Sequence, residues 1–194
     1  MSIIRKINEP ILTILAFLAI SVNLTQAQEF KLNNPESSLK VLGTSSLHDW
    51  HVTAEQQSGK INFSDIEAGK IESLSVSIVA ESLKSGKSSM DKNTYKALKT
   101  DDHKNISFQL TEVKDVVAKG NGAFSVKTMG NLTIVGTKKS ISLDFEMNLV
   151  GSKIKISGDK KIKMTDFNID PPKALFGTIT TGDDITIEFT TVFK

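Results

Sequence analysis

Strict alternation of apolar and polar residues is the feature that most constrains how this chain can fold. Apolar side chains recur at every second position in four separate segments, at 73–80, 106–111, 141–149 and 185–190. A period of two places the apolar side chains on one face of a β-strand and leaves the polar ones to water. Such strands are typical of antiparallel sheets with one wetted face, whereas strands of parallel α/β sheets are buried on both faces.

Short turns separate further predicted strands, which we place at 38–43, 47–55, 60–64, 122–135 and 153–163. The turns are marked by Gly, Asn and Asp, at Ser58-Gly59, Ala68-Gly69, Gly120-Asn121-Gly122, Gly136, Gly151 and Gly158-Asp159. About eight to ten strands at this spacing favour a sandwich or a barrel. A closed barrel has the further advantage that it leaves no edge strand open to aggregation.

Two segments break the alternation. Ser88–Leu98 begins with serines and sets Met90 and Tyr95 at roughly helical spacing, which predicts a short helix. Asp170–Gly177 has prolines near its start and glycine at its end, which predicts a second helix of a single turn. No internal repeat and no linker rich in Pro, Gly or Ser divides the sequence, so we expect residues 28–194 to form one domain.

The N-terminal segment has the features of an export signal. Arg5 and Lys6 precede an apolar run over residues 11–22, and small residues lead up to Ala27. A basic start, a short apolar run and a small-residue cleavage site are typical of a secretory signal peptide. The run is shorter than the roughly 20 apolar residues that span a bilayer. We therefore expect residues 1–27 to be a signal peptide that is cleaved after Ala27.

Composition excludes several classes of function. The chain has no cysteine, which rules out disulfide scaffolds, zinc sites with Cys ligands, iron–sulfur clusters, thiol nucleophiles and acylated lipoproteins. The formal net charge is +2, whereas a dedicated nucleic-acid binder needs a strongly basic surface to neutralise phosphates. We therefore expect no nucleic-acid partner.

His48-Asp49-Trp50-His51 is the most conspicuous polar cluster. In a strand, two histidines three positions apart project to opposite faces and cannot bind the same metal ion. Zinc needs three or four convergent ligands, and His103 is the only other histidine in the sequence. We expect no metal site here. Trp50 is expected to point inward as an aromatic filler, on the same face as His48.

Other motifs of cofactor or catalytic sites fail. Asp166–Asp170 begins like a calcium loop, but Pro171 and Gly177 stand where that loop requires Gly and Glu. The sequence contains no G-x-S-x-G elbow, dinucleotide fingerprint or Walker loop. We expect no cofactor and no catalytic residue.

Lysines alternate with isoleucines over residues 153–163, on both sides of a predicted turn at Ser157–Lys160. We interpret them as the basic outer face of a hairpin. A solvated strand face is the favoured account, because lysine at alternate positions keeps strands soluble. Transient contact with an anionic membrane surface is the alternative.

Five segments, in order along the chain, resemble elements of the YceI-like family, the polyisoprenoid-binding, lipocalin-like family of exported bacterial proteins. They are Ser45–Trp50 (SSLHDW), Met90–Lys99 (MDKNTYKALK), His103–Phe108 (HKNISF), Gly130–Lys139 (GNLTIVGTKK) and Met164–Ile169 (MTDFNI). The sequence departs from the family pattern at Lys104, where proline is usual, and at Asn168, where glycine is usual. Both departures affect turns.

The resemblance implies an extended antiparallel eight-stranded barrel, lipocalin-like, with a short helix packed at its side, a long apolar cavity and a place in the periplasm. It implies non-catalytic binding or transport of an isoprenoid or fatty acyl lipid. Strand parity supplies the inward residues of such a cavity, and with Trp50 they form the predicted ligand-binding set. The set is Trp50, Leu74, Val76, Ile78, Phe108, Leu110, Phe124, Val126, Leu143, Phe145, Ile187 and Phe189.

Inward apolar residues can also fill a barrel completely, because eight strands enclose a space just wide enough to be either packed or liganded. The alternative function is therefore a solid β-barrel interaction module without a ligand. The sequence leaves open whether the barrel forms a homodimer. It also leaves open which partners would deliver and receive a lipid.

Overall fold

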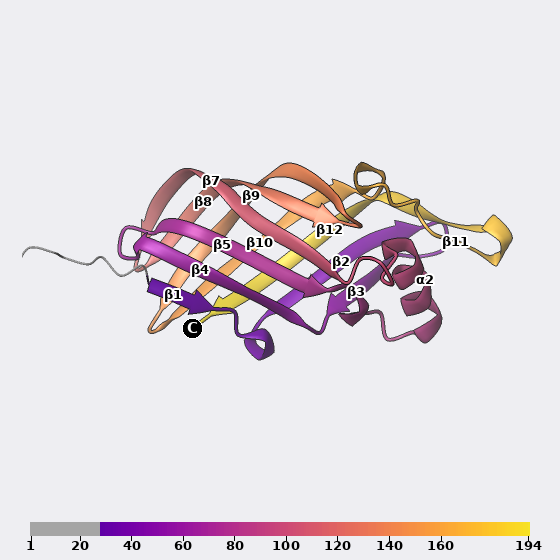
Figure 1. Ribbon diagram of the computed structural model, residues 1–194, viewed down its shortest axis with the longest axis horizontal. Helices are drawn as coiled ribbons and strands as arrows, with labels where there is room; N and C mark the ends of the chain where they lie inside the picture. The colour runs from indigo at the N-terminus through magenta and orange to yellow at the C-terminus, as the bar shows by residue number, and fades with distance from the viewer. Residues whose placement is uncertain (1–27) are drawn as a thin grey trace, which may run out of the picture.

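The computed structural model describes residues 28–194, so the predicted signal peptide lies outside the described residues. These residues form one curled antiparallel sheet with a short helix at one end (Figure 1). The strands are β1 (Gln28–Lys31), β2 (Ser38–Ser45), β3 (Trp50–Ala54), β4 (Gln57–Asp65), β5 (Lys70–Val79), β6 (Leu83–Lys84), β7 (Asn105–Gly120), β8 (Ala123–Ile134), β9 (Thr137–Val150), β10 (Lys153–Lys163), β11 (Lys173–Ala174) and β12 (Ile179–Phe193). The helices are α2 (Ser88–Leu98) and the 3-10 turns η1 (Asn34–Glu36), η2 (Ala80–Ser82), η3 (Thr165–Phe167) and η4 (Leu175–Gly177).

The all-β class and the antiparallel curled sheet are confirmed, although the strands outnumber the eight predicted. Their order is β1-β4-β5-β7-β8-β9-β10-β12-β2-β3-β6, and β11 pairs separately with β12. The larger number arises because three strands of the barrel are each interrupted once. β1 and β2 flank η1, β3 and β4 flank residues 55–56, and β5 and β6 flank η2. If each interrupted pair is counted as one strand, these three join β7, β8, β9, β10 and β12 to make eight.

The sheet closes where the N-terminal strand β1 meets the end of the C-terminal strand β12. Leu32 forms an isolated antiparallel bridge to Phe193, and the backbone groups of Lys31 and Lys194 exchange hydrogen bonds of 3.0 and 2.9 Å. The C-terminus accordingly lies beside β1 (Figure 1). Next to this bridge, the Glu36 carboxylate accepts a 2.6 Å hydrogen bond from Lys153, which lowers the pKa of Glu36.

The three interruptions are joined to one another by side chains. Asn34 donates from Nδ2 to the Glu55 carbonyl, and its Oδ1 accepts from the Gln57 N–H, both at 2.9 Å. The Ser82 hydroxyl donates to the Gln56 carbonyl at 3.3 Å. Backbone polar groups that lose their ladder partners at a break need replacements of this kind. Three neighbouring strands can therefore bend at the same level of the barrel.

The interior is solidly packed at the end of the barrel where Leu32 meets Phe193. The side chains that fill it come from β4, β8, β9 and β10 and are almost fully buried, as the alternation predicts. They are Ile61, Phe63, Phe124, Val126, Met147 and Ile154. No helix in the described part of the chain is both long enough and apolar enough to cross a membrane.

The helix at Ser88–Leu98 is confirmed as α2, but the predicted helix at Asp170–Gly177 is wrong in its first half. There Lys173 and Ala174 form β11, which pairs with β12, and one 3-10 turn, η4, follows. Prolines at 171 and 172 cannot donate the hydrogen bonds that would continue a helix through this segment. The chain instead leaves the barrel as a projecting hairpin (Figure 1).

Two predicted turns are also wrong, because their glycines lie inside strands. Gly59 is in β4, and Gly158 is in β10, which pairs with β12 without interruption along its length, so no hairpin forms at Ser157–Lys160. A side chain at Gly59 would place its Cβ 2.4 Å from the carbonyl oxygen of Ser75. Glycine within a strand often marks such a close approach rather than a turn.

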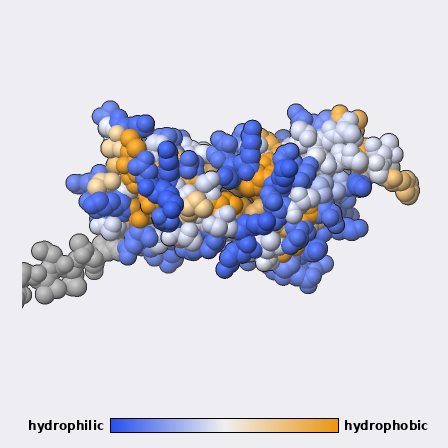
Figure 2. Space-filling model, turned by 90° about the horizontal axis from the view of Figure 1, so that it is seen from above, coloured by the Kyte–Doolittle hydropathy of each residue, from blue (hydrophilic) through white to orange (hydrophobic). Residues whose placement is uncertain are grey.

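The lysine pattern of β10 is nevertheless found on the outer face of the barrel. Lys155, Lys161 and Lys163 are exposed, whereas the isoleucines between them are buried. Hydrophilic residues cover much of the face shown in Figure 2. Contact of the β10 lysines with a membrane stays a prediction.

Replacing Asn34 with Ala should destabilise the barrel, because two backbone groups at the strand breaks lose their hydrogen-bond partner. The expected cost is about 1–3 kcal/mol of unfolding free energy, measured by urea denaturation. The control is Asn62→Ala, which removes one 2.8 Å bond to the Ser73 hydroxyl on the outer face of β4 and should cost less. Equal losses in the two variants would contradict a special role for Asn34.

Candidate functional site: an apolar cavity

A cavity of about 380 Å³ occupies the end of the barrel beside α2. Its wall consists of side chains from β2, β3 and every strand from β5 to β12, together with one face of α2. The volume falls within the range of about 300–1,000 Å³ that is typical of small-molecule sites. Exposed polar residues such as Ser89 and Lys173 line its outer end, and buried residues such as Ile156 and Phe193 line its inner end. The site is thus an apolar pocket with a polar mouth.

Most of the predicted ligand-binding residues lie on this cavity. They are Trp50, Leu74, Val76, Ile78, Phe108, Leu143, Phe145, Ile187 and Phe189. The other three predicted residues, Leu110, Phe124 and Val126, do not line it and belong to the packed core, with exposed fractions of 9%, 5% and 0%. Parity decides which face of a strand a residue occupies, but not how far along the barrel it lies. Alternation alone therefore could not separate the cavity wall from the packed core.

Three aromatic rings of the cavity wall lie over glycines on neighbouring strands. A Cβ atom at Gly43 would come within 2.2 Å of the Trp50 ring, and one at Gly130 within 2.2 Å of the Phe108 ring. At Gly158 the corresponding distance to Phe189 is 3.0 Å. The rings occupy space that side chains would otherwise fill. They therefore cover the wall with apolar surface without closing the centre of the cavity.

Two of the predicted cluster residues, one in the loop before β3 and one at the start of β3, lie at the cavity mouth. Trp50 and His48 both line the cavity, and the Trp50 Nε1–H donates to the Thr44 carbonyl at 3.0 Å. His51 lies on the outer face of β3 and is exposed. Within residues 28–194, no three or more His, Asp or Glu side chains gather as a metal site.

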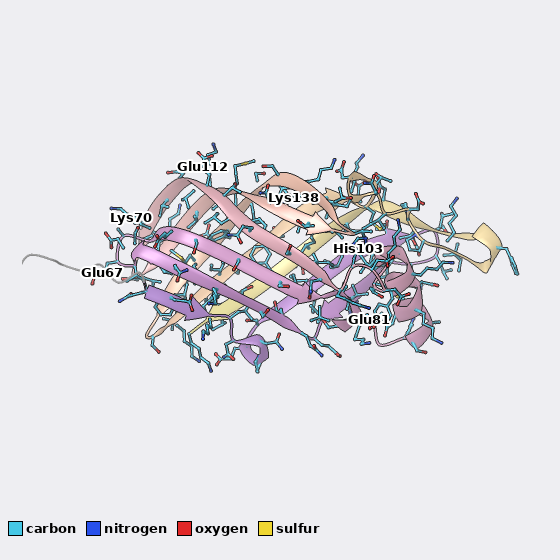
Figure 3. All side chains as sticks on the ribbon, viewed as in Figure 1. Glu67, Lys70, Glu81, His103, Glu112 and Lys138 are labelled. Carbon is cyan, nitrogen blue, oxygen red and sulfur yellow. The ribbon has the colours of Figure 1, made fainter. Side chains whose placement is uncertain are left out.

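Polar contacts hold α2 against the barrel. The Tyr95 hydroxyl donates to the Glu81 carbonyl at 2.8 Å and accepts a hydrogen bond from Lys84, which raises the pKa of Lys84. Glu81 lies beside α2 (Figure 3). The Asp91 carboxylate accepts hydrogen bonds from the hydroxyl and the N–H of Ser85, at 2.6 and 2.8 Å, and these bonds lower the pKa of Asp91. No residue of α2 is buried, so these bonds help to keep the helix in place.

A model of the YceI-like domain matches residues 30–193. The chain belongs to the YceI-like family. Several solved structures share the fold. BcnA from Burkholderia cenocepacia has a TM-score of 0.67 at 16% identity, covering 83% of this chain and 98% of its own. A polyisoprenoid binding domain from Saccharophagus degradans, implicated in plant cell wall breakdown, has a TM-score of 0.67 at 13% identity, with coverages of 85% and 97%.

The YceI protein of Campylobacter jejuni has a TM-score of 0.57 at 24% identity, covering 72% of this chain and 81% of its own. At these identities the likeness shows the fold alone. A search of curated proteins found no match.

The sequence reasoning missed several residues that line the cavity of this YceI-like barrel. On α2 these are Met90, Asn93, Thr94, Ala97 and Leu98, which form the face that covers the cavity. Apolar residues at i, i+7 and i+8 are the signal that could have found this face. On the strands, Leu39, Val41 and Lys160 were also missed. Lys160 was missed because the sequence predicted a turn at residues 157–160, where no inward strand position is expected.

Truncating two phenylalanines at different depths should separate the packed core of the YceI-like barrel from its cavity. Phe124→Ala removes a ring from the solid end and should cost about 3–5 kcal/mol of unfolding free energy. Phe145→Ala should cost less, because the ring of Phe145 already borders open space. Denaturant unfolding of both variants tests this difference. Similar losses would mean that the two rings are equally well packed.

Proposed function

We propose that this protein binds the apolar chain of an amphiphilic lipid in the cavity beside α2 and carries it without chemical change. The observation that carries the proposal is an apolar pocket of about 380 Å³ with a packed inner end and a polar outer end. Such a shape suits a molecule with one apolar and one polar end. The ligand class is an isoprenoid or fatty acyl lipid.

Membership of the YceI-like family and the likeness to a polyisoprenoid binding domain support lipid binding at the level of the family. We further propose that the protein works in the periplasm or is secreted, after cleavage behind Ala27. The basic start and the apolar run at 11–22 support this. An intact mass that begins at Gln28 in protein recovered from the periplasm would test it.

The alternative of a solid interaction module fits one half of the barrel and not the other. Val126 and Met147 are fully buried at the packed end, but Val76 and Leu143 face the cavity. A module without a ligand would have little need of the cavity, because unfilled apolar space forfeits packing contacts. The cavity therefore favours the carrier function.

Protein purified without detergent from a Gram-negative host should contain an extractable lipid, detected by native mass spectrometry. Val76→Trp should abolish this binding, because the indole would fill the space that the chain occupies. The matched control is Val117→Trp, which places the same side chain on an exposed position of β7. A wild-type protein that carries no lipid and takes none up from vesicles would refute the proposed function.

A single methyl group at Gly130 should shorten the longest chain that the cavity accepts. The new Cβ would meet the Phe108 ring at 2.2 Å and push it toward the centre of the cavity. Gly130 has no positive φ, so Gly130→Ala does not strain the backbone dihedral angles of this residue, although the new Cβ would also lie 2.9 Å from the carbonyl oxygen of Gln109. The affinities of fatty acids of increasing length, measured by fluorescence of the single Trp50, should fall off at a shorter chain than in the wild type. An unchanged length profile would show that Phe108 does not limit the cavity.

A further inference from the structure

One inward position of β10 carries a charge. The strand alternates so that residues 154, 156, 158, 160 and 162 face the interior. Three of these residues are buried isoleucines, and one is the glycine beneath the Phe189 ring. Lys160 occupies the remaining position, is half-buried and lines the cavity. An ammonium group at an apolar wall costs free energy unless it is hydrated or paired.

The Lys160 ammonium lies at a gap in the strand pairing of the barrel wall, where β9 and β10 are no longer paired with each other. The ladder between β9 and β10 ends at the pair Ser157–Glu146, and beyond it β10 pairs with β12 alone. Lys160 Nζ crosses this gap and donates a 3.0 Å hydrogen bond to the hydroxyl of Ser142, an exposed residue on the outer face of β9, so that the ammonium group is in contact with water. It forms no ion pair with any carboxylate of the described residues. A long side chain with an apolar stem and a charged tip suits this position between cavity and water.

The charged side chains that line the cavity are all lysines. Lys87, Lys160 and Lys173 line it, and no Asp or Glu of residues 28–194 does. Lys87 and Lys173 are exposed at the mouth, whereas Lys160 lies along the wall. A lining of this kind attracts anionic ligands and disfavours cationic ones.

We propose that the ligand is an acidic amphiphile whose carboxylate or phosphate group binds the Lys160 ammonium at the gap between β9 and β10. This inference rests on the proposed function and names the head group that the cavity selects. The apolar chain lies along the cavity wall, and the head group keeps access to water through the gap. An anionic oxygen and the Ser142 hydroxyl then share the three hydrogens of the ammonium group.

Two matched pairs of ligands test the head group on the full mature protein. Hexadecanoate is compared with hexadecanol, and farnesyl phosphate with farnesol, so that each pair differs in charge and not in chain. Trp50 lines the cavity, and its fluorescence reports binding. The wild type should bind the acid of at least one pair about tenfold more tightly than the alcohol, since a hydrogen bond to a charged group contributes about that much. The pair that shows the larger preference distinguishes carboxylate from phosphate.

Lys160→Met keeps the length of the side chain and removes its charge. It should weaken acid binding about tenfold and leave alcohol binding within twofold. The control is Lys161→Met, which removes a charge from the adjacent, outward-facing residue and should change neither. Lys160→Gln serves as a second variant, and thermal unfolding confirms that each protein is folded.

Equal affinity of the wild type for acid and alcohol would overturn this inference and leave the proposed lipid binding intact. A preference for acid that persists in both Lys160 variants would overturn the assignment to Lys160. Failure of all four ligands and of the native lipid extract to bind would overturn the proposed function, and this inference with it.

Discussion

Closure of the sheet is the constraint on which the rest of the structure depends. At one end, Leu32 and Phe193 join β1 to β12, and the core behind them is solidly packed. At the other end, closure rests on two residue pairs between β3 and β6 and on α2, none of whose residues is buried. Stability is concentrated at the solid end. The end beside α2 can therefore stay hollow, as ligand-binding regions often do.

The alternation in the sequence is sufficient to predict the class of fold, because each strand has one face toward the interior and one toward water. It does not predict depth. Phe124 and Phe145 both lie on the inward, apolar face of their strands, yet one lies in the packed core and the other on the cavity wall. Depth depends on register and on where the strands are interrupted. Those interruptions rest on contacts distant in sequence, such as the one between Asn34 and Gln57.

Glycine explains the main errors of the sequence reading. Gly59 and Gly158 were interpreted as turns because glycine tolerates the backbone conformations that turns need. In the barrel they serve a different purpose, since Gly158 accommodates the ring of Phe189 and Gly59 approaches the backbone of β5. A single sequence does not distinguish the two uses. The mistaken turn at residues 157–160 also concealed Lys160, the one charged inward residue of β10.

The cavity is a compromise between packing and binding. Large aromatic side chains give its wall apolar area, and the glycines beneath them keep that area from filling the centre. The contacts that such a wall forgoes in the empty protein are available to an apolar chain. A bound chain stabilises the folded state by mass action, because it binds the barrel and not the unfolded chain. On the proposed function, a ligand would restore the packing that the hollow end lacks, and the same side chains would couple stability to function.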